Sequence, residues 1–183
     1  MIPLSRNLTL SLTRRGFLAT TAVLSGSRSL RAGEPSGLRA RLLGAWRLLD
    51  AVTVFANRTT GPWYDRPGPY TGLIVYTSAG TMSVQIASAR PPAHGPPALD
   101  AMAAAEQLRY LNSYYAYFGR FEVNEADSAV RHIVESSLDP TEVGLTYTQK
   151  VSVARGRLIL TTQPWRVGTS WRHSRLTWTR ERK

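Results

Sequence analysis

The sequence predicts a mainly β fold, an eight-stranded antiparallel barrel with one helix inserted between strands three and four. Apolar and polar residues alternate in eight segments, most neighbouring segments are joined by short runs of turn-forming residues, and one stretch is rich in helix formers. Strands joined by short turns pair antiparallel. Eight strands can close into a barrel whose interior holds side chains or one small ligand. A sandwich of two sheets fits the same pattern and stays open as an alternative.

A short helix is predicted at residues 36–43 and a longer one at residues 99–113. In the longer helix an apolar stripe is formed by Leu99, Met102, Leu108 and Leu111. The strands are expected at residues 46–56, 70–77, 81–88, 115–124, 129–138, 145–154, 157–162 and 170–180. Two long loops, at residues 57–69 and 89–97, are rich in Pro and Gly, and the second cannot be a central strand because Pro lacks the N–H donor.

Composition narrows the class of function. The 183 residues suit one domain, and 23 basic residues against 12 acidic ones give a net charge of +11. Five Arg residues precede the first acidic residue, Glu34, and the later ones are scattered, so we expect no nucleic-acid partner. The chain has no Cys, which excludes disulfides, thiolate metal sites and cysteine nucleophiles.

Residues 11–32 have the organisation of an export signal, with a basic start, a short apolar stretch and an end of small residues. The apolar stretch, residues 17–24, is too short to cross a bilayer, which takes about 20 apolar residues. The motif TRRGFL at residues 13–18 resembles the twin-arginine export motif, with Ala19 where that motif ends in Lys. The alternative is a basic tail with a chance pair of Arg residues.

The resemblance implies that the twin-arginine export machinery is a partner of this chain. The residues that carry it are Arg14, Arg15, Phe17 and Leu18. We expect residues 1–32 to be the signal peptide, residues 33–41 a linker and residues 42–183 the barrel domain. The processed protein would have no stable membrane span and would be periplasmic or secreted.

Gly44-Ala45-Trp46, at the start of the first strand, resembles the G-x-W signature of lipocalins and their relatives. In that family the Trp plugs the closed end of the barrel, and an Arg from the last strand lies over its ring. Here Leu176, Trp178 and Arg180 share one face of the last strand. The resemblance therefore implies that Arg180 caps Trp46.

More of the chain resembles one group, the bacterial and fungal lipocalin-like domain proteins. The similar segments include LLGAWRLL at residues 42–49, GLIVYTSAGTMSVQI at 72–86, YYAYFGRFEV at 114–123 and VRHIVESSLDPTEVG at 130–144. The late strands are matched by RLILTTQP and SRLTWTR. The resemblance runs from about residue 42 to residue 180. It implies a fold and not a particular ligand, because one fold hosts varied functions.

His132 is the most informative candidate for the barrel interior. It alternates with Val130 and Val134, so it lies on the more apolar face of its strand. One interpretation is an imidazole that binds a ligand or transfers a proton, since the ordinary pKa of His, about 6.5, is easily tuned. The other is a buried His bonded to a neighbouring Tyr or to a backbone carbonyl.

Four further residues are predicted to line the cavity on the same argument of alternation. They are Tyr115, Tyr117, Tyr147 and Gln149. Aromatic walls with a few polar tips suit a small apolar ligand that carries one or two oxygens, although Tyr also fills barrels without binding anything. Trp63, Tyr64 and His94 lie in the long loops, where they either border the mouth of the barrel or belong to ordinary surface turns.

Catalytic and metal-binding patterns are absent from the sequence. His94, His132 and His173 lack the spacing of metal ligands, and we expect no metal, no cofactor and no dedicated catalytic residues. Three hypotheses remain. The first is an exported barrel that binds a small apolar molecule. The second is an isomerase or cyclase that uses His132 with a cavity Tyr, and the third is a filled barrel with a structural or protein-binding role.

Overall fold

The computed structural model describes residues 37–66, 68–89 and 98–181. Residues 1–36 lie outside the described residues, and with them the predicted export signal and its residues Arg14, Arg15, Phe17 and Leu18. His94 lies outside them as well. The described residues belong to one compact unit of the chain.

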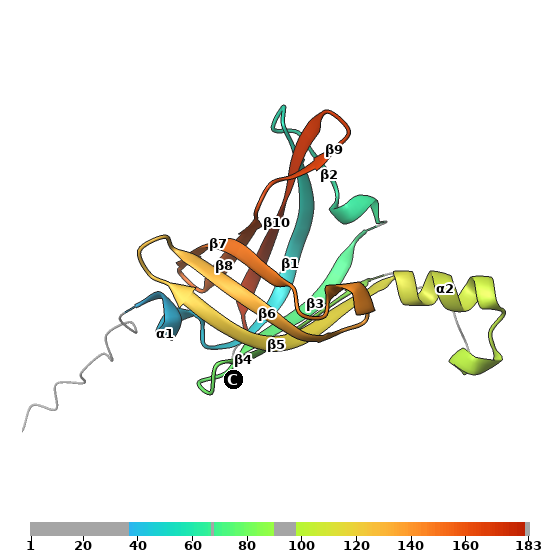
Figure 1. Cartoon of the computed structure of the whole chain (residues 1–183), viewed down its shortest axis with the longest axis horizontal. Coiled ribbons are helices and arrows are strands. Elements are labelled where there is room, and N and C mark those ends of the chain that lie inside the picture. Colours follow the sequence, from blue (N-terminus) through green and yellow to red (C-terminus); the bar gives the residue numbers. More distant parts are fainter. Residues whose placement is uncertain (1–36, 67, 90–97, 182–183) are drawn as a thin grey trace, which may run out of the picture. The chain divides into compact units, whose positions relative to one another are not determined.

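Eight strands form the barrel, in the chain order that the sequence predicts (Figure 1). They are β1 (Gly44–Phe55), β3 (Tyr70–Tyr76), β4 (Thr81–Ser88), β5 (Tyr114–Asn124), β6 (Ala129–Ser137), β7 (Thr146–Ala154), β8 (Arg157–Thr162) and β10 (Ser170–Arg180). Each pairs antiparallel with its neighbour. The bounds agree with the predicted strands to within two residues because turn residues punctuate the alternating segments.

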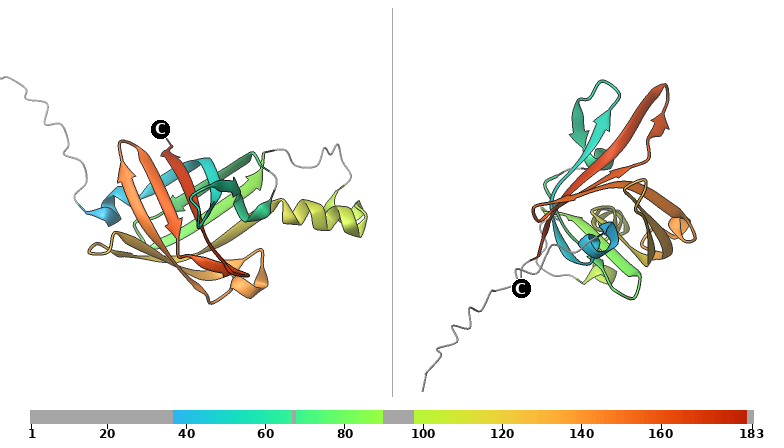
Figure 2. Two further views of the ribbon diagram at one scale, coloured as in Figure 1. Left: turned by 90° about the horizontal axis from the view of Figure 1, so that it is seen from above. Right: turned by 90° about the vertical axis from the view of Figure 1, so that its left-hand side faces the viewer.

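The first and last barrel strands pair with each other, which closes the sheet (Figure 2). Their register runs from Trp46 opposite Arg180 to Phe55 opposite Arg172, with one irregularity between Leu48 and Asp50. Because a single sheet returns to its first strand, the barrel prediction is confirmed and the two-sheet sandwich is wrong. Closure also pairs each of the eight strands on both sides along at least part of its length, so that none is an edge strand.

Two short strands lengthen the sheet at one end of the barrel. They are β2 (Thr60–Pro62), which pairs with the end of β1, and β9 (Trp165–Val167), which pairs with the start of β10. A 3-10 turn, η1 (Trp63–Asp65), follows β2 directly. The sequence predicted loops at both places, because β2 ends in Pro62, β9 follows Pro164, and three residues are too few to show alternation.

The predicted long helix is present in a shorter form. A 3-10 turn, η2 (Leu99–Ala101), precedes the helix α2 (Ala104–Asn112), and the extended residue Met102 separates them. No residue of α2 is buried, and Leu108 is 58% exposed. The apolar stripe therefore reflects high helix propensity and not a face packed against the barrel core.

Close strand packing explains one glycine of the fourth barrel strand. Gly119 lies at an irregularity in the pairing of β5 with β6. A Cβ atom built on Gly119 would lie 2.0 Å from the carbonyl oxygen of Ile133. Only Gly lets the two backbones approach this closely, and the resulting bend helps the sheet to curve.

Candidate functional site

One end of the barrel is sealed by Trp46, which is fully buried. The guanidinium carbon of Arg180 lies 4.1 Å from the centre of the Trp46 ring, and its Nη1 donates to the carbonyl of Leu43 at 2.7 Å. The Trp46 indole N–H donates to the carbonyl of Leu42 at 2.8 Å. Gly44 has a φ of 115°, and a Cβ there would lie 3.1 Å from Arg180 Nη1. The glycine of the G-x-W signature thus allows both a left-handed backbone and the approach of the Arg.

A short helix, α1 (Leu38–Leu42), covers the same end. Its two leucines are buried in the core, so the packed unit includes part of the stretch expected to be a linker. The carboxylate of Glu125, in the turn after β5, accepts hydrogen bonds from the backbone N–H groups of Leu38 and Arg39 at 2.6 and 3.0 Å. These bonds hold the pKa of Glu125 below its ordinary value. A carboxylate satisfies the free N–H groups at a helix N-terminus, and here it pins α1 to the barrel.

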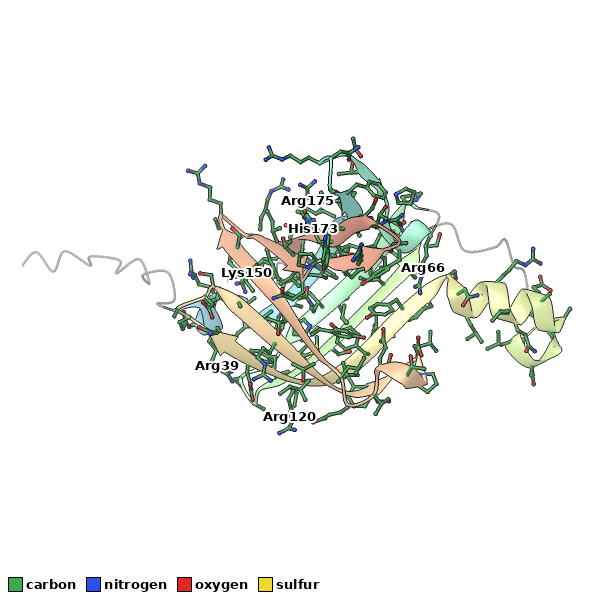
Figure 3. The ribbon with its side chains drawn as sticks, turned by 45° about the horizontal axis from the view of Figure 1, so that its top comes forward. Arg39, Arg66, Arg120, Lys150, His173 and Arg175 are labelled. Atoms are coloured by element: carbon green, nitrogen blue, oxygen red, sulfur yellow. The ribbon has the colours of Figure 1, made fainter. Side chains whose placement is uncertain are left out.

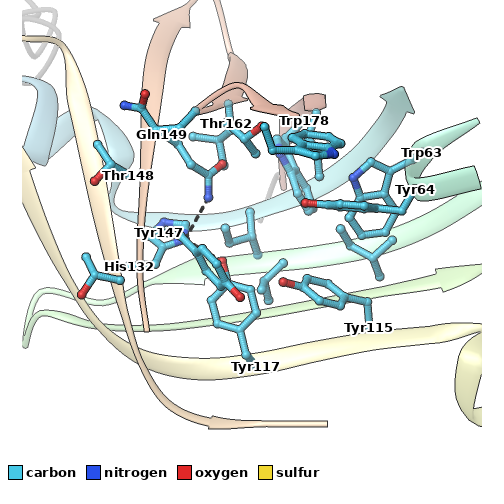
Figure 4. A pocket seen from close by; sticks show the side chains of 18 of the residues that line it. Trp63, Tyr64, Tyr115, Tyr117, His132, Tyr147, Thr148, Gln149, Thr162 and Trp178 are labelled. Atoms are coloured by element: carbon cyan, nitrogen blue, oxygen red, sulfur yellow. Dashed lines mark hydrogen bonds between the residues drawn. The ribbon is translucent and has the colours of Figure 1, made fainter. Parts of the chain in front are cut away.

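The barrel interior holds a cavity of about 360 Å³ (Figure 4). The volume falls in the range of small-molecule sites, roughly 300–1,000 Å³. Its walls are mostly aliphatic and aromatic, with a few hydroxyl and amide groups. The lining residues include Ile74, Val84, Ile86, Leu160 and Leu176, the aromatic Trp63, Tyr64, Trp165 and Trp178, and all five predicted residues, His132, Tyr115, Tyr117, Tyr147 and Gln149.

His132 is fully buried and bonded through both ring nitrogens. Its Nε2 lies 2.8 Å from the hydroxyl of Tyr76, and its Nδ1 lies 2.7 Å from the hydroxyl of Tyr117 and 3.2 Å from Nε2 of Gln149. An amide NH₂ only donates, so with Gln149 in this orientation Nδ1 accepts, and Nε2 carries the proton that is donated to Tyr76. The arrangement is that of a buried His bonded to neighbouring Tyr residues, the second of the two interpretations.

Burial lowers the pKa of His132 to about 3, because no carboxylate offsets the cost of a buried charge. The imidazole is therefore neutral at physiological pH. A proton-transfer catalyst needs a pKa near the working pH and a nitrogen within reach of the substrate. The pKa of His132 is far below the working pH and both of its ring nitrogens are bonded to other side chains, which argues against the isomerase or cyclase hypothesis.

Three tyrosines bring hydroxyl groups to the cavity. Burial is the main cause that raises the pKa of Tyr115, Tyr117 and Tyr147 above the ordinary range. The negative charge of Glu142, in the 3-10 turn η3 (Pro140–Glu142), raises all three further. Glu142 accepts a hydrogen bond from Ser137 Oγ at 2.7 Å, which fixes the carboxylate there. The three phenols are thus neutral. Because Nδ1 of His132 accepts, the Tyr117 hydroxyl donates its one proton there, and its oxygen can only accept from a ligand.

The extension of the sheet by β2 and β9 brings aromatic rings to the other end of the barrel. Trp63 is 3% exposed and packs edge-on against Tyr70 and Tyr115, with ring centres 5.9 and 5.4 Å apart. Tyr64 stacks on Trp165 from the opposite hairpin, with ring centres 5.2 Å apart and planes 19° apart. Tyr64 has a left-handed backbone, with a φ of 49°, which is strained for a residue with a side chain. This stacked pair lies at the mouth of the cavity.

Sequence reasoning missed four residues of the site. Tyr76 alternates correctly for an inward position, but only barrel closure shows that it reaches His132, 56 residues away. Trp165 lies in a stretch predicted as loop. Glu142 lies in the segment DPTEVG, whose Asp, Pro and Gly residues indicate a turn and no role in the site. Trp178 was considered for the face it shares with Arg180 and not for the cavity.

Several other features bear on the class of protein. Among residues 37–66, 68–89 and 98–181 no group of three or more His, Asp or Glu is placed to hold a metal ion. The same residues contain no helix long and apolar enough to span a membrane. Labelled basic residues lie around the barrel and not on a single face (Figure 3). Arg120 and Arg131 form surface ion pairs with Glu135 and Glu122, both at 2.9 Å.

A closed antiparallel barrel with a tryptophan plug at one end and a cavity behind an aromatic mouth defines a lipocalin-type barrel, a class suited to binding ligands. The sequence profile of the family described as Lipocalin-like domain matches residues 43–181, and the chain belongs to that family. A comparison with curated proteins gave no match.

Proposed function

We propose that this chain is an exported lipocalin-like protein that binds a small, mostly apolar molecule inside its barrel. The observation that carries the proposal is the cavity of about 360 Å³, whose walls are largely aliphatic and aromatic. Burial of apolar surface would drive binding, at roughly 25 cal/mol per Å² before the costs of association. The hydroxyl groups of Tyr115 and Tyr147 at the cavity wall would orient a ligand that carries one or two polar atoms.

The cavity also weighs against a filled barrel with a purely structural role. A void of this size in a protein interior is costly, because the side chains around it lose packing contacts. A barrel selected only for stability would be expected to fill it. Binding of a ligand returns those contacts and would raise the stability of the protein.

The direct test is to fill the cavity. Val84 is buried on β4 and lines the cavity, so Val84→Phe would extend a ring into the empty space. Val75 on β3 lies between the buried residues Ile74 and Tyr76 and therefore faces outward, and Val75→Phe is the matched control. We expect isothermal titration with 2-ethylnaphthalene to show stoichiometric binding by the parent protein and the control, and a loss of at least about tenfold in Val84→Phe.

Equal affinity in all three proteins would place the probe outside the cavity and contradict the proposal. Thermal unfolding of each variant checks that a loss of binding is not a loss of fold. Native mass spectrometry of the purified mature protein would then look for a molecule that copurifies with it.

Export is supported by the sequence of residues 11–32 and has its own test. The double variant Arg14→Lys, Arg15→Lys should leave the full precursor in the cytoplasm, because the Arg pair is what the twin-arginine machinery would recognise. Fractionation of cells that express the tagged chain measures this. Undiminished export of the double variant would contradict the assignment.

A further inference from the structure

Two tryptophans that line the cavity differ from the tryptophan of the closed end in the hydrogen bonding of their indole N–H groups. Trp63 is 3% exposed and Trp178 is fully buried, yet their indole Nε1 atoms have no hydrogen-bond partner among the described residues. The Nε1 of Trp46 has such a partner, the carbonyl of Leu42. Buried polar groups are hydrogen bonded as a rule, so each exception calls for a physical reason.

The two indoles belong to the wall of one cavity. Trp63 comes from η1 at the mouth, and Trp178 comes from the inward face of β10. Figure 4 shows both side chains at the wall of the pocket, in the neighbourhood of Tyr64. An indole N–H is a donor only and cannot be satisfied by another donor. A ligand that fits these two groups therefore has to present a hydrogen-bond acceptor.

The charged groups around the cavity indicate that the acceptor group of the ligand is uncharged. Among the described residues that line the cavity there is no Lys or Arg, and the guanidinium of Arg66 lies over the rings of Trp63 and Tyr115 at 5.8 and 5.7 Å from their centres. The charge of Glu142 is felt by the cavity phenols, whose pKa values it raises, so the interior disfavours a second negative charge. A buried carboxylate would need a cationic partner that this wall does not offer.

We infer that Trp63 and Trp178 form an acceptor-binding site, and that the ligand is an apolar molecule with an uncharged acceptor such as a ketone, ester, lactone or ether oxygen. The inference rests on the proposed function, since it needs a ligand in the barrel. A hydrogen bond from either indole N–H to the acceptor would orient the molecule and favour it over a hydrocarbon of the same shape, because only the acceptor satisfies a buried N–H group.

Indole proton resonances test the inference directly. The chain has five tryptophans, which give five indole signals in a ¹⁵N-labelled sample, assigned by single Trp→Phe variants. The probes are 2-acetylnaphthalene, which has a carbonyl acceptor, and 2-ethylnaphthalene, which has nearly the same shape and no acceptor. We expect the ketone to move the Trp63 and Trp178 protons downfield, the hydrocarbon to cause no such shift, and the signals of Trp46 and Trp171 to stay in place with both probes.

Affinities of the variants give a second measurement. Trp63→Phe and Trp178→Phe keep an aromatic ring and remove the donor, and each should weaken binding of the ketone by about 3- to 10-fold relative to the hydrocarbon, the effect of one hydrogen bond. Trp171, 54% exposed on β10, supplies the control Trp171→Phe, in which the ratio of the two affinities should not change. If Trp178→Phe fails to fold, Trp63→Phe and the resonances of the unmodified protein still decide the result.

The outcomes separate the two proposals. Binding of both probes with equal indole shifts, or with none, would overturn the acceptor site and leave the ligand-binding function standing. Absence of binding for both probes up to their solubility would overturn the proposed function, and the acceptor site with it. Downfield shifts confined to the ketone complex, lost in the matching Trp→Phe variant, would establish the acceptor site.

Discussion

The two ends of the barrel use the same kind of side chain for opposite purposes. At the closed end Trp46 has its ring capped by Arg180 and its N–H bonded to Leu42. At the open end Trp63 keeps an unpartnered N–H group within the described structure, as does Trp178 in the cavity wall, and Tyr64 holds a left-handed backbone. The difference indicates that the closed end is built for stability and that the open end retains unsatisfied groups for a ligand.

Removing the closed-end plug should have the largest effect on stability. Trp46→Ala empties a fully buried aromatic site, and we expect a loss of about 3–5 kcal/mol in the free energy of unfolding. Chemical denaturation measures the loss. The matched change at the other end, Trp63→Ala, should cost less, because one side of that ring borders the cavity. Equal losses in the free energy of unfolding would contradict the proposal that the two ends have different roles.

His132 lies between the two ends and links stability to pH. Its pKa is about 3 in the folded protein and about 6.5 in an unfolded chain, so between these values the unfolded state binds more protons. Its contribution to stability is therefore complete above about pH 6.5 and is lost as the pH falls towards 3, by roughly 1 kcal/mol per pH unit.

Denaturation between pH 4 and pH 7 measures this dependence. His132→Phe should flatten it and lower stability at pH 7 by about 1–3 kcal/mol, because Tyr76, Tyr117 and Gln149 lose a shared partner. His173→Gln, on the outer face of β10, is the control and should leave the pH dependence as it is. A steep dependence that survives in His132→Phe would assign the effect to other groups.

The contact of Arg180 with Trp46 should appear as a coupling energy. Arg180→Ala removes the ring contact and the bonds to two backbone carbonyls, and it should cost less than Trp46→Ala. The loss of stability in the double variant should be smaller than the sum of the two single losses by roughly 0.5–3 kcal/mol, because either change alone already breaks the contact. Strict additivity in a double-mutant cycle would mean that the cap contributes nothing through the ring.

The sequence predicted the barrel because strand alternation and turn residues are local signals, and Gly44 and Trp46 marked the first strand. It predicted the inward faces of β5, β6 and β7 for the same reason, and so placed Tyr117, His132 and Gln149 in one interior. Two partners of His132, Tyr117 and Gln149, come from the strands next to β6 in the chain. The third, Tyr76, lies 56 residues away, and no local pattern contains that contact. The same holds for the stack of Tyr64 on Trp165, which joins two hairpins more than 100 residues apart.

The stack of Tyr64 on Trp165 is where we expect the smallest effect on stability. It also gives the clearest test of how a ligand passes the open end. Trp165→Ala removes the ring on which Tyr64 rests, and loss of this ring contact should lower the free energy of unfolding by about 0.5–1.5 kcal/mol. The release of 2-acetylnaphthalene, followed by stopped-flow fluorescence, should become faster by up to about tenfold. Trp171→Ala, which removes an exposed ring from the neighbouring strand, should leave release unchanged.

The association rate then tells what the pair does. If Tyr64 and Trp165 act as a gate, their separation lowers the barrier in both directions, so that association and release accelerate together and the affinity is unchanged. If Trp165 instead contacts the bound molecule, only release accelerates and the affinity falls by the same factor. A rate of release that matches the parent protein would show that ligands pass the mouth without parting the stack, and the strained backbone of Tyr64 would then need another explanation than gating.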